Sequence, residues 1–172
     1  MKYSDYTSAD AADIREMILD IYSAVHSSSG DPFRSRNRFS EFYDKWSAKP
    51  SWSCVVSFAA QGNPTGFAYG ASFAPGGWWK GAERPDSVPQ DAPTFALSEL
   101  LVLEEWRKTG TSKQLHDIVV NSCGDALSTL CVDVAHPKVV RLYESWGYVK
   151  EGEQKPFEDS PTFAVMVKRL RP

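Results

Sequence analysis

The start of the chain carries two segments in which apolar residues recur at helical spacing. Between Thr7 and Val25 the apolar positions fall three or four residues apart: Ile14, Met17, Ile18, Ile21, Tyr22 and Val25. This period predicts an amphipathic helix, and Thr7 with Asp10 has the spacing of a capping box at its start. A second helix is predicted from Arg34 to Trp46. Its apolar face would consist of Phe39, Phe42, Tyr43 and Trp46.

Downstream, the pattern changes to aromatic and β-branched runs typical of strands. Residues 51–61 and 65–74 flank the turn "GNP" and predict an antiparallel hairpin. Three further apolar runs predict strands: 94–105, 126–135 and 161–170. Two helical patterns separate them. The resulting order, α-α-β-β-β-α-β-α-β, predicts an α+β fold with a mostly antiparallel front and a β-α-β unit behind it.

The two later helices are predicted from shorter patterns. The helix of "SKQLHDIVV" would have one face formed by Leu115, Ile118, Val119 and Ser122. The helix of "HPKVVRLYESWGY" would have one side formed by Val139, Leu142, Tyr143 and Trp146. Pro137 suits its first turn and Gly147 its C-terminal end. The strand of residues 161–170, taken as an apolar sheet edge, leaves room for a homodimer.

Residues 75–93 form a Gly- and Pro-rich connection that is too long for a routine loop. Loops of this length are often lids or binding loops, and this one carries Trp78 and Trp79. The two rings either bind a cationic amine by cation–π contact, or they cap the core or line a dimer interface. The pattern shows no repeat and no second domain, so a single domain over residues 1–172 is predicted.

Composition excludes several classes of function. The net charge is −3 and the Lys and Arg residues are dispersed, which argues against a nucleic-acid groove and favours small, in particular cationic, substrates. Three cysteines in apolar surroundings suggest reduced thiols. The sequence has neither a signal-peptide pattern nor an apolar run of about 18 residues, so a cytoplasmic protein is expected. The three scattered histidines predict no metal site.

The segment "EEWRKTGTSKQLHD", residues 104–117, joins a predicted strand to a predicted helix. The start of a helix has free backbone N–H groups that suit anions. Gly110 permits close approach of a ligand, and Arg107 and Lys108 add positive charge. The joint is therefore either a seat for a phosphate or pyrophosphate, or a tight turn with two solvated basic residues. Neither a Walker loop nor a dinucleotide-binding G-x-G-x-x-G is present.

Two motifs together resemble the GNAT superfamily of acetyl-CoA-dependent N-acetyltransferases. "RKTGTS" fits [RQ]-x-x-G-x-[GA], except that Ser112 replaces the final small residue. "HPKVVRLYESWGY" fits N-x-x-A-x-x-L-Y-x-x-x-G-[FY], with His136 in place of Asn and Val139 in place of Ala. The wider sequence is similar to a GNAT subgroup common in actinobacteria.

The resemblance implies a GNAT fold: a mixed, mostly antiparallel central sheet with helices on both faces and a splayed strand pair. The pantetheine arm of acetyl-CoA would enter that gap against Leu101, Val102 and Leu103. Its pyrophosphate would rest on the backbone of Lys108, Thr109, Gly110, Thr111 and Ser112. Arg107 would anchor the loop or the phosphate, and the hydroxyls of Thr111 and Ser112 are alternative donors. His136 would either donate a hydrogen bond to the cofactor or only begin a helix.

The resemblance also implies roles in catalysis. Tyr143 matches the tyrosine that protonates the coenzyme A thiolate, although it also lies on an apolar stripe as a core tyrosine would. The oxyanion donor would be a backbone N–H near Val102. No metal takes part.

The general base is predicted from the residues themselves. Glu99 is an acid within an apolar strand, where a carboxylate is expensive unless it is paired or functional. A raised pKa would suit it to accept an ammonium proton, whereas a salt bridge across the sheet would make it structural. Alternation places Glu99 and Val102 on opposite faces unless the strand contains a bulge. Asp133, Glu104 and solvent are alternative bases.

Taken together, the sequence predicts transfer of an acetyl group from acetyl-CoA to a primary amine of a small molecule by direct attack. Two alternatives stay open: a coenzyme A-binding sensor or interaction module of the same fold without turnover, and an N-acetyltransferase acting on proteins or peptides. Nucleic acids and membranes are not expected partners.

Overall fold

Seven strands build one mixed sheet, mostly antiparallel with one parallel pair, in the order β1-β2-β3-β4-β5-β7-β6. The structure, a computed structural model, describes all residues 1–172. The strands are β1 Lys2–Thr7, β2 Ser53–Phe58, β3 Pro64–Ser72, β4 Thr94–Val102, β5 Leu127–Asp133, β6 Val149–Gln154 and β7 Phe163–Arg169. The helices are α1 Ala11–Val25, α2 Arg36–Ser47, α3 Thr111–Ser122 and α4 Pro137–Ser145, with 3₁₀ turns η1 Ser8–Asp10, η2 Pro32–Arg34 and η3 Glu104–Trp106. The predicted α+β class is confirmed.

The chain divides into two compact units, residues 1–71 with 97–123, and residues 72–96 with 124–172. Strand β4 contributes its first three residues to the second unit and the rest to the first. This division concerns contacts only, so the predicted single domain stays a prediction. None of the helices has the length and apolar character needed to cross a membrane.

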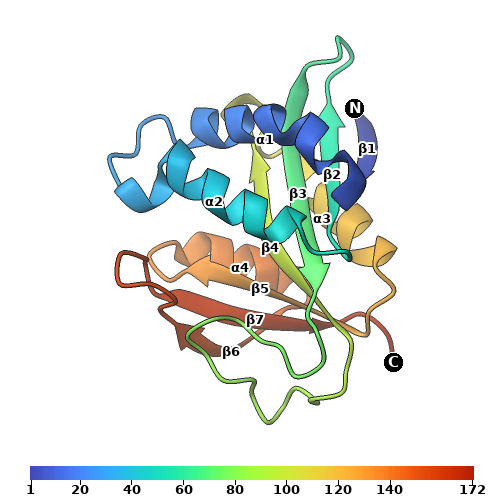
Figure 1. The fold of residues 1–172 in the computed structure, drawn as a ribbon, viewed down its shortest axis with the longest axis vertical. Helices are drawn as coiled ribbons and strands as arrows, with labels where there is room; N and C mark the ends of the chain where they lie inside the picture. The colour runs from blue at the N-terminus through green and yellow to red at the C-terminus, as the bar shows by residue number, and fades with distance from the viewer. The chain divides into compact units, whose positions relative to one another are not determined.

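In the first unit, α1 and α2 pack on one face of β2 and β3 (Figure 1). Both helices confirm the predicted patterns, and the core between them contains the rings of Tyr22 and Phe39, stacked with centroids 3.8 Å apart. The backbone N–H of Thr7 donates to Asp10 at 2.8 Å, as the predicted capping box requires. The predicted hairpin is also present, because β2 and β3 pair antiparallel.

Helix α3 also belongs to the first unit and packs against β2. Leu115 and Val119 are buried as predicted, and Ile118 is partly buried. Ser122 is exposed, however, so that part of the predicted face is wrong. His116 and Val120 are buried instead.

In the second unit, β7 lies between β5 and β6 and pairs antiparallel with both. The prediction that residues 161–170 form a sheet edge is therefore wrong. The edge is β6, which the sequence pattern did not reveal. On α4, Val139 and Leu142 are 40% and 42% exposed, so the predicted apolar side of this helix is not a buried face.

The loop of residues 75–93 contains no helix or strand, as predicted, and is held within the second unit. Arg84 organises it by donating to the carbonyl oxygens of Gly77, Pro89 and Ala92 and to the hydroxyl of Thr94. The loop also supplies Val88 to a buried cluster with Leu127 and Val167. The loop thus covers part of its own unit's sheet.

Candidate active site

Strand β4 ends at the joint between β4 and α3, and its last residues are tightly packed against β3. The N–H of Leu103 donates to the carbonyl of Thr65 at 2.9 Å. A Cβ on Gly66 would lie 2.6 Å from the carbonyl oxygen of Leu101, so only glycine fits there. Since successive backbone N–H groups of a strand point in opposite directions, that of Val102 points away from β3. The amide of Leu103 is therefore occupied within the protein, whereas that of Val102 is directed away from β3; contact of this strand end with a pantetheine arm stays a prediction.

The joint itself leaves a run of backbone donors free. No protein atom accepts a hydrogen bond from the N–H groups of residues 108 to 112. Lys108 and Gly110 both have left-handed conformations, with φ of 60° and 85°. The first bond of α3 runs from Gln114 N–H to the Gly110 carbonyl at 3.1 Å, and no side chain caps the helix. A turn of this kind at a helix start presents a concave set of donors that suits an anion.

Two threonine hydroxyls in the joint are occupied within the protein. Thr109 donates its hydroxyl hydrogen to the Trp106 carbonyl at 2.6 Å and lies 2.7 Å from the Thr111 hydroxyl. Because Thr109 has only one such hydrogen, Thr111 must donate to Thr109. Thr111 is also 3% exposed. The alternative role of Thr111 as a phosphate donor is therefore wrong, whereas Ser112 makes no hydrogen bond with its hydroxyl.

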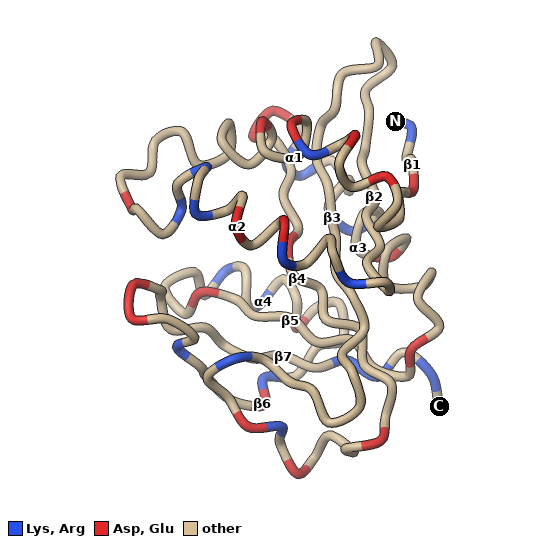
Figure 2. The backbone as a smooth tube through the Cα atoms, viewed as in Figure 1, with Lys and Arg blue, Asp and Glu red and all other residues tan.

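The basic residues beside these donors differ in their partners. Lys113 forms an ion pair with Asp117, which also accepts a hydrogen bond from the ring nitrogen Nδ1 of the buried His116 at 2.8 Å. Arg107 and Lys108 are exposed and form no ion pair. Their charge is therefore available to a ligand at the start of α3. Along the chain, Lys and Arg residues are interspersed with Asp and Glu residues (Figure 2).

Glu99 lies half-buried on β4 in a low-polarity environment. Burial raises the pKa of its carboxyl to about 7, although the Arg34 cation acts in the opposite direction. Glu99 makes no salt bridge and no hydrogen bond, so the alternative of a salt bridge across the sheet is wrong. A group with a pKa near neutrality can take up a proton at physiological pH, as a general base must.

Three residues that the sequence pattern did not single out surround Glu99. Burial, followed by the negative charge of Glu99, raises the pKa of both Tyr22 and Tyr69. Tyr69 is fully buried, and a side-chain hydrogen bond with Ser98 acts against the rise in its pKa. Arg34 also lies close to His26, whose pKa is lowered by burial and by the cations Arg34 and Arg107. These positions come from α1, η2 and β3, and no local pattern could have connected them.

The pairing of β4 with β3 contains one extra residue on β4. Hydrogen bonds join Phe73 to Thr94 and Leu103 to Thr65, both at 2.9 Å. Thr65 and Phe73, on the β3 side, are eight positions apart in the sequence. Thr94 and Leu103, on the β4 side, are nine positions apart. This one-residue excess is what a β-bulge contributes. Leu101 and Leu103 pack towards the α1 and α2 core, the side on which Glu99 acts on Tyr22 and Tyr69.

Tyr143 belongs to the second unit and is 9% exposed on α4. Its ring contacts those of Trp146 and Tyr148 edge-on, with centroids 5.1 and 5.7 Å apart. This environment fixes the ring but is compatible with both predicted roles, thiolate protonation and core packing. His136 precedes α4 with an exposed ring, and its Nε2 lies 3.7 Å from a carboxylate oxygen of Asp133. Its carbonyl, not its ring, accepts the first helical hydrogen bonds.

The two tryptophans of the long loop have partners within the second unit. Trp79 donates its indole N–H to the Thr129 hydroxyl at 3.0 Å. Trp78 packs on the buried cluster around Val88, and the Arg84 guanidinium lies 5.1 Å from its ring centroid. A cation therefore already occupies one face of Trp78. These contacts agree with core caps, and substrate binding by either ring stays a prediction.

Residues 87–170 match the family model described as an acetyltransferase (GNAT) domain. This segment, slightly less than half of the chain, is similar to GNAT acetyltransferase domains. This match agrees with the prediction that the protein is an acyltransferase, which stays a prediction for the chain as a whole. No curated protein matches the sequence.

Solved structures share the fold over nearly the whole chain. The ribosomal-protein-S18-alanine N-acetyltransferase from Escherichia coli is similar with a TM-score of 0.66 and 15% identity, covering 99% of this chain and 94% of that one. A spermidine N-acetyltransferase SpeG chimera from Vibrio cholerae and hSSAT gives 0.61 and 17%, covering 98% and 94%. The PaiA N-acetyltransferase from Thermoplasma acidophilum, in complex with coenzyme A, gives 0.59 and 13%, covering 98% and 99%. At these identities the comparison establishes the fold alone.

Proposed function

We propose that this protein transfers an acetyl group from acetyl-CoA to a primary amine of a small molecule. The observation that carries the proposal is the run of five unpaired backbone N–H groups from Lys108 to Ser112, at the uncapped start of α3. These donors, with the unpaired charges of Arg107 and Lys108, suit the pyrophosphate of the cosubstrate. The N–H of Val102 would face its pantetheine arm, with Leu101 and Leu103 on either side of it in the chain, and His136 would be a further contact. We also propose that the chain belongs to the GNAT subgroup common in actinobacteria.

In the proposed mechanism, Glu99 accepts a proton from the substrate ammonium and so frees its nitrogen lone pair. The nitrogen attacks the thioester carbonyl carbon, and the Val102 N–H stabilises the negative charge on the carbonyl oxygen. The carbon–sulfur bond then breaks, Tyr143 donates its hydroxyl proton to the departing thiolate, and the second proton lost by the substrate nitrogen restores the tyrosine hydroxyl. The attack is direct, without a covalent bond to the protein. Glu99 suits its role because its pKa of about 7 allows both protonation states near neutrality.

The surroundings of Glu99 favour a small acceptor. Tyr22 and Tyr69 are at most 5% exposed, so the carboxyl lies among buried rings. An extended polypeptide would need an open surface at this point. We also propose that the protein acts in the cytoplasm.

Two alternatives depend on specific features. The Escherichia coli neighbour is named for a protein acceptor, which keeps protein or peptide acetylation as a second candidate. Ser112 and His136 depart from the residues usual in the two motifs, which would suit a coenzyme A-binding module without turnover.

Calorimetric titration with acetyl-CoA, followed by a thiol-release assay over a panel of small amines and peptides, tests the proposal. We expect saturable binding and thiol release with one or more small amines. Release only with peptides would select the second candidate, and binding without release would select the module. The absence of binding at millimolar acetyl-CoA would exclude the acetyl-transfer proposal.

A further inference from the structure

The sheet ends in two edge strands that differ in how they are protected. An edge strand exposes unpaired backbone groups, and proteins usually protect it with a bulge, charges or a short length. Strand β6 has such protection: its register with β7 shifts between Lys150 and Gly152, and Lys150, Glu151 and Glu153 are charged. Strand β1 pairs with β2 in unbroken register over all six residues, from Lys2 opposite Phe58 to Thr7 opposite Ser53. Strand β1 also carries the charged residues Lys2 and Asp5 and is no longer than β6, but it contains no bulge, so its outer side is a regular edge.

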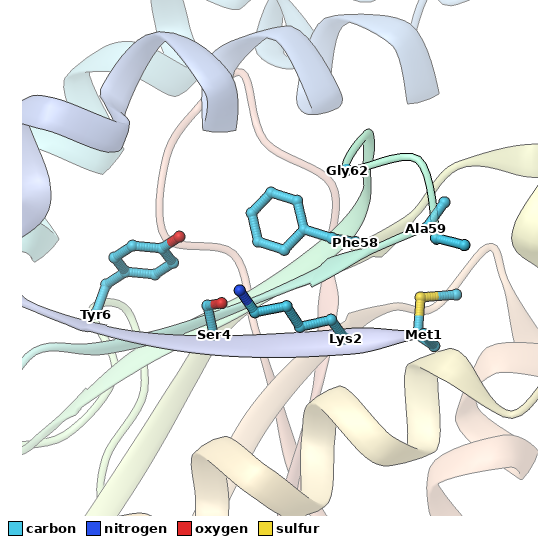
Figure 3. Close-up of a pocket in the computed structure, with 8 residues that line it drawn as sticks. Met1, Lys2, Ser4, Tyr6, Phe58, Ala59 and Gly62 are labelled. Atoms are coloured by element: carbon cyan, nitrogen blue, oxygen red, sulfur yellow. The ribbon is translucent and has the colours of Figure 1, made fainter.

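A groove runs along this edge on one face of the sheet. Lys2, Ser4 and Tyr6 have their side chains on the same face as Phe58, as Figure 3 shows. With the turn around Gly62 they enclose a cavity volume of about 500 Å³. The free edge of β1 is thus bordered by two aromatic rings and one cation.

We propose that a second copy of this chain pairs with β1, antiparallel, around a two-fold axis perpendicular to the sheet. Such an axis keeps each side chain on its own face, so opposed residues must both be even-numbered or both odd-numbered. With Ser4 opposite its own copy at the axis, Lys2 faces Tyr6 of the second copy. Tyr3 then faces Asp5 of the second copy. The groove then receives the ring of the second copy's Tyr6, and Lys2 lies between that ring and the ring of Phe58.

Contacts between charged side chains and aromatic rings favour this register over the neighbouring ones. In it, every charged residue of β1 meets an aromatic ring: Lys2 meets Tyr6 by cation–π contact, and Asp5 meets Tyr3 within reach of a hydroxyl. A shift of the axis to Asp5 places two like carboxylates directly opposite each other, which is destabilising. A shift to Tyr3 leaves Lys2 opposite Ser4 and loses the ring contact. The dimer needs no residue of the proposed acetyl-transfer site, so the two proposals can fail independently.

The test uses opposite charges at the two-fold axis. Sedimentation velocity of the whole protein at high micromolar concentration should show a dimer that dissociates on dilution. Ser4→Lys and Ser4→Glu should each be monomeric, because like charges then meet across the axis. An equimolar mixture of these two variants should dimerise again, since every pair carries opposite charges. Ser122→Lys, the same substitution at the exposed end of α3, should dimerise as the unmodified chain does.

A monomer at all concentrations, dimeric Ser4→Lys, or a mixture that stays monomeric would each overturn the proposal. Circular dichroism of each variant separates loss of pairing from loss of folding. Ser4→Cys provides a second measurement that does not depend on charge. Residues opposed across an antiparallel pair have Cα atoms about 4.5 or 5.5 Å apart, within the range that a disulfide spans. Mild oxidation should therefore cross-link Ser4→Cys but not the unmodified chain with its three native thiols, and failure to cross-link would contradict the register.

Discussion

Replacement of Glu99 by glutamine should change stability and activity in opposite directions. In the folded protein, burial raises the pKa of the Glu99 carboxyl from 4.5 to about 7. The charged form is therefore disfavoured in the native state, and the protein bears that cost wherever Glu99 is ionised. Glutamine has nearly the same shape and no charge. The variant should thus be more stable at alkaline pH and yet lose the proposed base.

The size of the stability change follows from the two pKa values. Because one pKa unit corresponds to about 1.4 kcal/mol, the shift from 4.5 to about 7 sets an upper limit of ~3 kcal/mol. The sign follows from proton linkage: the native state binds the proton more tightly than the unfolded state. The stability that the native state gains from holding this proton is fully present below pH 4.5 and is lost as the pH rises through about 7. The gain in Glu99→Gln should therefore be near zero at pH 4 and largest at pH 8.

Urea denaturation of both proteins at pH 4, 6 and 8 measures this difference in unfolding free energy. Turnover of acetyl-CoA with an accepted amine should fall about 100-fold or more in the variant, as is typical when a general base is lost. The rise of activity through about pH 7 should disappear as well. Glu105→Gln, which replaces an exposed carboxylate just beyond the same strand, serves as the matched control and should change neither quantity. A stability gain that is equal at pH 4 and pH 8 would refute the linkage reasoning, and an unchanged pH–rate profile would remove Glu99 as the base.

Three further substitutions test other parts of the structure. Tyr143→Phe should lower turnover about 100-fold and leave acetyl-CoA affinity in calorimetry unchanged; full turnover would leave Tyr143 with a packing role only. Gly110→Ala should cost about 1 kcal/mol of stability from its positive φ and weaken acetyl-CoA binding about tenfold. Its matched control is Gly124→Ala, which has a similar φ of 77° and equally open surroundings; equal loss of binding in both would contradict the anion seat. Arg84→Ala removes donors to three carbonyls and one hydroxyl and should destabilise the protein by about 2 kcal/mol in urea denaturation; no change would show that these bonds do not hold the loop.

The spacing of apolar residues was sufficient to predict the helices and strands that bury one face. The stripes of α1 and α2 and the apolar hairpin β2–β3 were predicted because each buries regularly spaced side chains on a single core. The two edge strands were not predicted. Their sequences, "KYSDYT" and "VKEGEQ", are polar because one side of each has no neighbouring strand. Without burial there is no apolar period to detect. The position of β7 between β5 and β6 is likewise a matter of long-range pairing.

The candidate site was predictable where a residue conflicts with its local surroundings. Glu99 stands out because a carboxylate in an apolar strand is unfavourable, and the joint stands out because its glycine and basic residues precede a helix. What surrounds Glu99 was not predictable. Tyr22, Arg34 and Tyr69 are distant in sequence and meet Glu99 only through the packing of α1 and η2 against the strands.

The ways in which the helices begin support the same interpretation of the joint. Ser35 accepts from the N–H of Arg38 at the start of α2, and Asp31 accepts from the N–H of Phe33 at the start of η2. Helices α1 and α4 also begin without a side-chain cap, but α3 is the helix that begins with glycine and leaves the N–H groups of residues 108 to 112 without a partner. A capping side chain typically stabilises a helix by about 1 kcal/mol, so its absence at the start of α3 is a cost to folding. Such local exceptions concentrate at functional sites. A cap at Gly110 would occupy the same N–H groups that an anion needs, which explains why stability and binding exclude each other at this position.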